Sequence, residues 1–372
     1  MTGATVVGLY FYRLSGAGGG AERMLCQLAN ALALRDFDVH LISWDAENAT
    51  AFYPIDPAVH WIKLGFKPGR LDKFRRIRAF HSVLRWYKIQ ALVGFVMSGD
   101  RTVYAATKLA GVKLIVAERN APEMYRFRYG PLQRWLTFRL LGLADCITVQ
   151  MENYSAGYPR RLKERIVTIP NPVAATNCYA TPDVANAAGR YTLLAVSRLD
   201  PIQKQIGCLM CAFASISEKL PEWDLCIIGD GPEEAALHLL IEECGLADRI
   251  RIESSTPDVF DAYVRSHLFA IPSRWEGFPN ALAEAMSHGL PAVGFANAAG
   301  VAELIGPEGG WLAEGLDDEE ALAAMLATAM ADGEERLRRG RSGARRMSQF
   351  TPERQFDRWA DLLSALTKDR TL

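Results

Sequence analysis

The chain has 372 residues, of which 49% are hydrophobic and 23% are charged. These values are typical of globular proteins, and the length predicts two domains while excluding a small disulfide-stapled fold and long disorder. The net charge of −1 conceals an asymmetry, because residues 1–171 hold 24 Lys and Arg against 13 Asp and Glu, and the rest hold 18 against 30. A first half of charge +11 predicts contact with something anionic.

The cysteines and the apolar segments predict the compartment. Seven cysteines, odd in number and scattered, indicate reduced thiols and a cytoplasmic location. No apolar run approaches the roughly 18 residues of a transmembrane helix, and no secretion signal is visible. We therefore expect neither a membrane span nor export.

The first half alternates short apolar segments with helical ones. A strand is expected at residues 5–12, then a Gly-rich turn, then a helix over residues 22–34 with apolar residues at helical spacing. Further strands are expected at residues 39–43, 91–97, 113–117 and 146–149. Such alternation predicts a parallel sheet with helices on both faces.

The same pattern restarts after Ile169–Val173, where two prolines disfavour a helix and indicate a linker. A late helix over residues 352–366 carries an apolar stripe that must be buried. The sequence thus predicts an α/β chain of two doubly wound, Rossmann-like domains facing across a cleft, over residues 1–171 and 172–350, with a closing helix over 351–372. The strands of the second domain are expected at residues 191–196, 224–228, 249–252, 268–271, 292–295 and 310–313.

The sharpest motif is residues 273–286, SRWEGFPNALAEAM, directly after an expected strand. Pro279 suits the first turn of a helix, so the backbone before and after it should present unpaired N–H groups to an anion or a hydroxyl. Glu276 lies in the loop and Glu284 about one turn inside the helix. Both carboxylates can face one pocket, Glu284 on the vicinal hydroxyls of a ribose and Glu276 on a second polyol. The alternative is a solvated helix start enriched in acids by the helix dipole.

Two glutamates separated by seven residues, the first followed by Gly277, Phe278, Pro279 and Asn280, resemble the signature of retaining family 4 glycosyltransferases of the GT-B fold. The resemblance runs from about residue 5 to 366. Further segments similar to the family are Gly19–Arg23, Ile169–Val173, Ser197–Leu199 with Lys204, and Ile228–Pro232.

The resemblance implies roles for these residues. Arg198 and Lys204 would neutralise the donor diphosphate in place of a metal, and fixed cations there would act mainly in the transition state. Glu284 would bind the ribose, and Glu276 with the backbone of residues 277–280 the donor sugar. The resemblance also implies retention at the anomeric carbon, the leaving phosphate taking the acceptor proton, and a closing helix packed on the first domain.

The Gly-rich loop at residues 16–21 supports two interpretations. Gly19 and Gly20 allow close backbone approach at a helix start, which suits a phosphate or the reacting face of a donor sugar. The loop also fits a dinucleotide fingerprint, with Asp45 placed like a ribose-binding acid, which predicts an NAD-dependent oxidoreductase. Against this alternative, residues 13–15 separate the glycines from their strand, and the two motif glutamates stay unexplained.

The segment Glu118, Arg119, Asn120 ends an expected strand of the first domain. The family commonly presents a His to the donor sugar here, and Arg119 stands in its place, as in a sub-group with Glu-Arg-Asn-x-Pro. We expect this loop to contact the reacting centre and the acceptor, although Arg is too basic to act as a general base. The alternative is a structural ion pair between Glu118 and Arg119.

Two basic segments of the first half, residues 70–88 and 125–139, interleave cations with aromatic residues. The first reads as a helix whose apolar side carries Phe74, Ile77, Phe80 or His81, and Leu84. Arg75, Arg76 and Arg78 would then contact an anionic membrane surface or a pyrophosphate carried on a lipid. The alternatives are a solvated helix and a nucleic-acid surface, and no nucleic-acid-binding module supports the latter.

We therefore expect a peripheral enzyme at the cytoplasmic face of the cell membrane that moves a hexose or N-acetylhexosamine from a nucleotide sugar to a lipid pyrophosphate-linked glycan. Uridine is favoured as the base, with guanosine second. Neither a metal nor another cofactor is expected, because the six His residues are dispersed. Asp36–Asp38 reads as a turn before a strand, and Cys208 with Cys211 as core packing.

Overall fold

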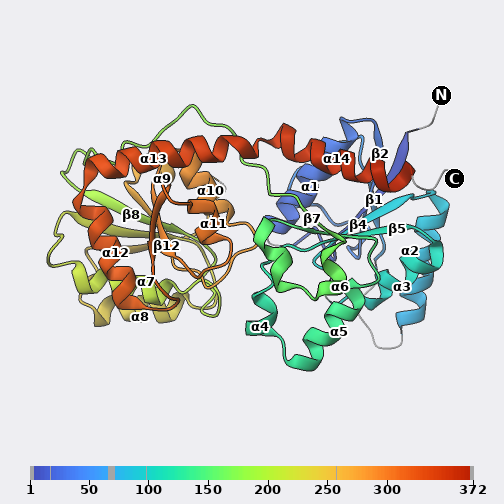
Figure 1. Ribbon diagram of the computed structural model, residues 1–372, viewed down its shortest axis with the longest axis horizontal. Helices are drawn as coiled ribbons and strands as arrows, with labels where there is room; N and C mark the ends of the chain where they lie inside the picture. The colour runs from blue at the N-terminus through green and yellow to red at the C-terminus, as the bar shows by residue number, and fades with distance from the viewer. Residues whose placement is uncertain (1–3, 17, 66–71, 98, 257, 369–372) are drawn as a thin grey trace. The chain divides into compact units, whose positions relative to one another are not determined.

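The βα alternation builds two separate parallel sheets. The computed structural model describes residues 4–16, 18–65, 72–97, 99–256 and 258–368. It divides into two compact units, which are described separately (Figure 1). Unit 1 comprises the chain up to Asn171 together with Glu353 onward, and unit 2 runs from Pro172 to Pro352.

Unit 1 is built on a seven-stranded sheet in the order β3-β2-β1-β4-β5-β6-β7, in which every pairing is parallel. Its strands are β1 Thr5–Tyr10, β2 Phe37–Ser43, β3 His60–Lys63, β4 Ala91–Phe95, β5 Lys113–Ala117, β6 Cys146–Val149 and β7 Ile166–Thr168. Its helices are α1 Gly20–Ala33, α2 Lys73–Trp86, α3 Arg101–Ala110, α4 Met124–Arg128, α5 Pro131–Leu141, α6 Arg160–Lys163 and α14 Pro352–Lys368.

Unit 2 repeats this design with a six-stranded parallel sheet in the order β10-β9-β8-β11-β12-β13. Its strands are β8 Tyr191–Val196, β9 Trp223–Ile228, β10 Ile250–Glu253, β11 Leu268–Ile271, β12 Ala292–Phe295 and β13 Gly310–Ala313. Its helices are α7 Ile206–Ile216, α8 Glu234–Glu243, α9 Phe260–Arg265, α10 Asn280–Ser287, α11 Val301–Ile305, α12 Glu319–Ala331 and α13 Gly333–Met347.

The central strands confirm the predicted pattern, and two edge strands were missed. β5, β6, β8, β11, β12 and β13 have the predicted bounds, whereas β1 and β4 end two residues earlier than predicted. β3 and β7 lie at the two edges of the unit 1 sheet and are only partly buried. Edge strands need less apolar sequence, which is why these short segments carry a weak strand signal.

The closing helix α14 belongs to unit 1 (Figure 1). Its stripe of Phe356, Trp359 and Leu363 is buried in the same core as β1 and α1. Polar contacts hold the exposed side, with Arg35 Nε 2.8 Å from Asp357 Oδ1. The apolar stripe predicted from the sequence therefore finds its partner more than 300 residues away along the chain.

The predicted apolar side of the basic helix is partly wrong. In α2, Phe80 and Leu84 are buried, but the ring of Phe74 is 85% exposed. Arg76 instead points inward, in the row that includes Phe80 and Leu84 at four-residue spacing, and its side chain is only 14% exposed. The methylene stem of an arginine can be buried in this way while its charge stays paired. Residues 70 and 71 of the predicted helix lie outside the described part.

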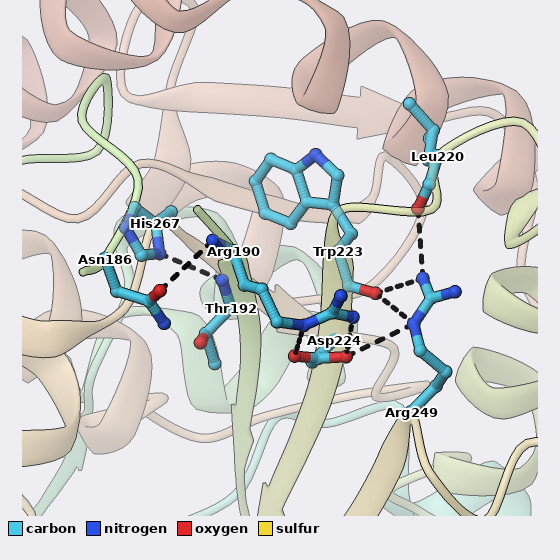
Figure 2. A network of polar contacts seen from close by, with 8 residues as sticks. All are labelled: Asn186, Arg190, Thr192, Leu220, Trp223, Asp224, Arg249 and His267. Carbon is cyan, nitrogen blue, oxygen red and sulfur yellow. Dashed lines mark hydrogen bonds and ion pairs between the residues drawn. The ribbon is translucent and has the colours of Figure 1, made fainter. Parts of the chain in front are cut away.

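The start of the unit 2 sheet is fixed by a charged network (Figure 2). The carboxylate of Asp224 accepts two hydrogen bonds from Arg190, one of them 2.6 Å from Nε to Oδ2, and one of 3.2 Å from Arg249. His267 accepts the Thr192 N–H at Nδ1 over 2.9 Å. These contacts lie at the opposite end of the sheet from the strand ends where ligands bind.

Asp36–Asp38 and the cysteine pair were expected to have structural roles. Asp36, with a φ of 62°, forms the turn before β2, but Phe37 and Asp38 already belong to the strand, so the turn predicted over Asp36–Asp38 is shorter than expected. Cys208 is buried on the apolar helix α7, which agrees with core packing, whereas Cys211 on the same helix is only partly buried. Within the described ranges, no helix has both the length and the apolar character needed to cross a bilayer.

Candidate active site

Three loops meet at the carboxyl ends of the unit 2 strands. The loop after β8 carries Arg198 and lies against the loop after β9, with Leu199 N donating to Asp230 O over 2.9 Å. This close approach requires glycine, since a Cβ on Gly229 would lie 1.8 Å from the Ser197 carbonyl oxygen. On Gly231 it would lie 2.3 Å from the Leu199 carbonyl oxygen. The Gly-Pro turn thereby positions the backbone that bears Arg198.

Two predicted residues, Lys204 and Glu276, are in direct contact although 72 residues separate them. Lys204 Nζ lies 2.5 Å from Glu276 Oε1, and both side chains are largely buried. The Ser273 hydroxyl donates to the same carboxylate oxygen over 2.7 Å. Ser273 is therefore a further residue of this cluster, and nothing in the sequence other than its position in the motif indicated it.

Backbone contacts hold the Glu276 loop in place. Gln203, which is buried, donates from Nε2 to the Trp275 carbonyl over 3.0 Å, and Arg274 N donates back to Gln203 O over 2.9 Å. Glu276 N donates to Ala299 O over 2.8 Å. The segment between β12 and α11 thus helps to hold the Glu276 loop in place. The sequence assigned no role to this segment.

Arg198 differs from Lys204 in its surroundings. Its side chain is exposed and makes no ion pair with any residue that the structure describes. The two predicted diphosphate ligands are therefore in different states, since Lys204 is paired with a carboxylate and Arg198 is available to solvent.

The helix after the motif begins one residue later than predicted. Pro279 is the N-cap and α10 starts at Asn280, so the proline precedes the first turn. Phe278 is buried and packs edge-on against Phe350, with ring centroids 5.8 Å apart, so any donor contact here must come from its backbone.

Glu284 lies one turn inside α10 and has a partner that the sequence did not reveal. The hydroxyl of Tyr263, on α9, donates to Glu284 Oε2 over 3.1 Å. Tyr263 is fully buried, and its ring stacks on His288 at 5.7 Å between centroids. A buried phenol thus restrains one oxygen of the carboxylate predicted to bind ribose.

In unit 1, the side chains of Glu22 and Asp45 lie against the Gly-rich loop and the residues just before it. Gly19 is the N-cap of α1, which starts at Gly20, and a Cβ on Gly19 would lie 2.5 Å from Glu22 Oε2. Asp45 is buried and accepts hydrogen bonds from the N–H groups of Leu14, over 2.8 Å, and Ser15, over 3.2 Å. Burial opposes ionisation of Asp45, but these bonds and that of the Ser15 hydroxyl outweigh it and lower its pKa.

The two charged residues that follow β5, Glu118 and Arg119, have different hydrogen-bond partners. Glu118 is buried and accepts hydrogen bonds from the hydroxyls of Tyr125 and, over 3.1 Å, Tyr158. Burial, only partly offset by these bonds, raises its pKa. Arg119 donates instead to the side-chain oxygen of Asn171. The ion pair weighed as an alternative is therefore wrong, and Asn120, next in the chain, is partly exposed.

The predicted basic surface of α2 is wrong at one of its three arginines. Arg75 and Arg78 are exposed, as predicted, but Arg76 is not a surface residue. Its guanidinium lies 4.3 Å above the Trp44 ring, with Nη2 3.7 Å from Asp100 Oδ2. The expected surface contact of Arg76 is replaced by this inward ion pair.

Comparison with known proteins agrees with the predicted family. The family model described as "Glycosyl transferases group 1" matches residues 181–346, and the model described as "Glycosyl transferase 4-like domain" matches residues 19–172. The chain belongs to the group 1 glycosyltransferases. One match thus falls in each unit, and the predicted fold of two Rossmann-like domains of the GT-B type is confirmed.

Similar proteins cover nearly the whole of this glycosyltransferase. The amylovoran biosynthesis glycosyltransferase AmsD of Erwinia amylovora is 26% identical, over 93% of this chain and 96% of its own. A Campylobacter jejuni N-acetyl-D-galactosaminyltransferase, named for a PP-undecaprenol-linked glycan, is 23% identical over 93% and 95%. The structure of Anabaena HepE, solved with UDP and glucose, superposes with a TM-score of 0.79 at 18% identity, covering 97% and 99%.

Family membership also decides between the two functions considered for the glycine loop. The NAD-dependent oxidoreductase required Asp45 to hold a ribose, but the Asp45 carboxylate already accepts hydrogen bonds from the backbone N–H groups of Leu14 and Ser15, in the loop after β1. Its carboxylate orders residues 14 and 15. No group of three or more His, Cys, Asp or Glu side chains that could hold a metal lies within the described ranges, and metal independence stays a prediction.

Proposed function

We propose that this glycosyltransferase moves a hexose or N-acetylhexosamine from a nucleotide sugar to a glycan acceptor, with retention at the anomeric carbon and without a metal. The observation that carries the proposal is the contact of Lys204 with Glu276 at the carboxyl ends of the unit 2 strands. A UDP-sugar is favoured and a GDP-sugar is second. HepE, solved with UDP and glucose, supports the favoured base by analogy.

The proposed chemistry follows from charge development. As the glycosidic bond breaks, the leaving diphosphate gains negative charge, and Arg198 and Lys204 stabilise it most in the transition state. Glu276 holds Lys204 in place before the donor binds and orients the donor sugar together with the backbone of residues 277–280. The leaving phosphate takes the acceptor proton on the same face, so Glu276 is not a nucleophile. Glu284 binds the ribose.

The acceptor is proposed to be a glycan on a lipid pyrophosphate, reached from the cytoplasmic face of the cell membrane. The similarity to AmsD and to the Campylobacter enzyme supports a role in polysaccharide or glycan assembly. On α2, the exposed rings of Phe74 and Trp86 lie on the same helix as the exposed Arg75 and Arg78. This combination suits an anionic membrane surface.

Ligand binding and kinetics test the proposed donor site. Uridine nucleotides should raise the melting temperature of the purified protein without magnesium, because a ligand that binds only the folded state stabilises it. Glu284→Ala should raise the donor KM more than it lowers kcat, whereas Arg198→Ala should lower kcat. Stabilisation by NAD but by neither UDP nor GDP, or wild-type kinetics in both variants, would contradict the proposal.

A further inference from the structure

Arg119 is a partly buried cation without a matching anion. Its Nη2 donates to the neutral amide oxygen of Asn171, and its Nε is buried without a hydrogen-bond partner. Its guanidinium carbon lies 5.0 Å from the centre of the Phe95 ring. Among the residues that the structure describes, no carboxylate pairs with it. Burial lowers the pKa of the Arg119 guanidinium to about 9, because no nearby anion balances its positive charge.

Other inward-facing arginines of the chain show how such a charge is ordinarily satisfied. Arg76 also has a buried Nε without a hydrogen-bond partner, but the carboxylate of Asp100 lies 3.7 Å from its Nη2 and balances its charge. Arg336, only 2% exposed, donates to three backbone carbonyls, including Pro182 O at 2.7 Å and Met330 O at 2.6 Å. Arg119 has neither arrangement. Since a buried charge is costly unless it is paired, the free protein bears a cost at this position that a ligand can remove.

The nearest carboxylate in the sequence is held away from Arg119. Glu118 accepts hydrogen bonds from two tyrosine hydroxyls. Asn171 is likewise fixed, because its side-chain oxygen also accepts from Gln150 over 3.2 Å. Arg119 is thus held by neutral groups at the carboxyl end of β5, which is the end at which doubly wound sheets bind ligands.

We propose that Arg119 is the receptor for an oxyanion carried by a substrate of this enzyme, either a carboxylate on the donor sugar or a phosphate on the acceptor. The inference rests on the proposed function and narrows its substrate class to an acidic one. The forked donors of a guanidinium suit a planar carboxylate or a phosphate, and Nε is the donor that is still unpaired.

Two probes distinguish the sources of the oxyanion. Wild type and Arg119→Gln are titrated with UDP-glucose, UDP-glucuronate and, in the presence of saturating UDP, farnesyl diphosphate. A loss in UDP-glucuronate affinity that is at least about tenfold larger than any loss in UDP-glucose affinity, with UDP affinity unchanged, places the anion on the donor. The same loss for farnesyl diphosphate places it on the acceptor. Equal affinities of both acidic probes for the two proteins, or no binding of either to wild type, overturns the inference.

A second variant keeps the test independent of folding. Asn171→Asp puts a carboxylate where Arg119 already donates, so the melting temperature should rise while the acidic probe binds at least about tenfold more weakly. Unchanged probe affinity in Asn171→Asp contradicts the inference. UDP is the control for the proposed function itself, because failure of both UDP and GDP to bind would overturn the donor assignment and not the role of Arg119.

Discussion

At the scale of single residues, Tyr263 shows how the candidate donor site is organised. Its hydroxyl lies 3.1 Å from Glu284, and its ring is fully buried between Phe269 and His288. A carboxylate on a short helix can rotate among several orientations, and fixing it in advance reduces the entropy lost when a ribose binds. Tyr263 therefore acts through Glu284 as a positioning residue.

Removal of this hydroxyl should weaken donor binding. A neutral-to-charged hydrogen bond contributes about 1.5–3 kcal/mol, so Tyr263→Phe should raise the donor KM by about tenfold or more and change kcat less. Steady-state kinetics with the nucleotide sugar measure the effect. Tyr104→Phe is the matched control, because the Tyr104 hydroxyl is buried without a partner and its loss should leave the donor KM unchanged. An unchanged KM in Tyr263→Phe would exclude the positioning role.

The sequence identified Glu284 but not Tyr263, for a physical reason. The motif around Glu284 is local, whereas Tyr263 reaches it only because α9 and α10 flank β11. The same applies to Ser15 and Asp45, which lie on separate segments joined at the ends of β1 and β2. Contacts of this kind depend on strand order, which residue types alone do not encode.

At the scale of elements, α2 was predicted as a basic amphipathic helix, and its two sides were partly misassigned. An aromatic residue was placed inside and an arginine outside, but Phe74 is exposed and Arg76 packs on Trp44. Hydrophobicity alone favours the predicted arrangement. The Asp100 carboxylate and the Trp44 ring, both from other elements, make the interior position of Arg76 favourable.

Because Arg76 points inward, Arg75 and Arg78 are the residues of this trio that can contact a membrane. Each basic residue near a charged bilayer contributes about 1 kcal/mol, so the double variant Arg75→Glu, Arg78→Glu should lose at least about tenfold in affinity for phosphatidylserine-containing liposomes. Arg76→Met is the contrasting variant and should bind them like wild type but melt at a lower temperature, because Asp100 loses its cation. Sedimentation with liposomes measures the binding, and undiminished binding by the double variant would rule out this surface.

At the scale of the whole molecule, each unit contains a histidine whose environment favours the neutral form. His267 in unit 2 accepts the Thr192 N–H, and the pKa of its ring is lowered chiefly by burial. His40 in unit 1 is buried too, and burial lowers its pKa against the opposing effect of Asp38. Protonating His267 would remove the acceptor that ties the start of β8 to the ring (Figure 2).

These two histidines should therefore make the protein less stable in acid, against the opposing effect of Glu118, whose pKa is raised. A folded pKa below the ordinary value of 6.5 means that the unfolded chain binds protons first, so the stability is complete above about pH 6.5 and falls as the pH drops below it. Urea unfolding at about pH 7.5 and about pH 5.5 should show this loss. His267→Gln should be less stable than wild type at the higher pH and should lose less on acidification. An equal pH dependence in the variant would exclude His267 as a cause.

By itself, the sequence determined the two Rossmann-like units, the family and the residue types of the candidate site. The βα alternation and the motif at residues 273–286 are local patterns, and such patterns can be recognised from the order of residues alone. Tertiary structure decided which side chains meet. Lys204 contacts Glu276 because β8 and β11 are neighbours in the sheet although they are far apart in the sequence. It also placed Arg119 next to the neutral side chain of Asn171. The carboxylate of Glu118, its neighbour in the sequence, accepts a hydrogen bond from a tyrosine instead.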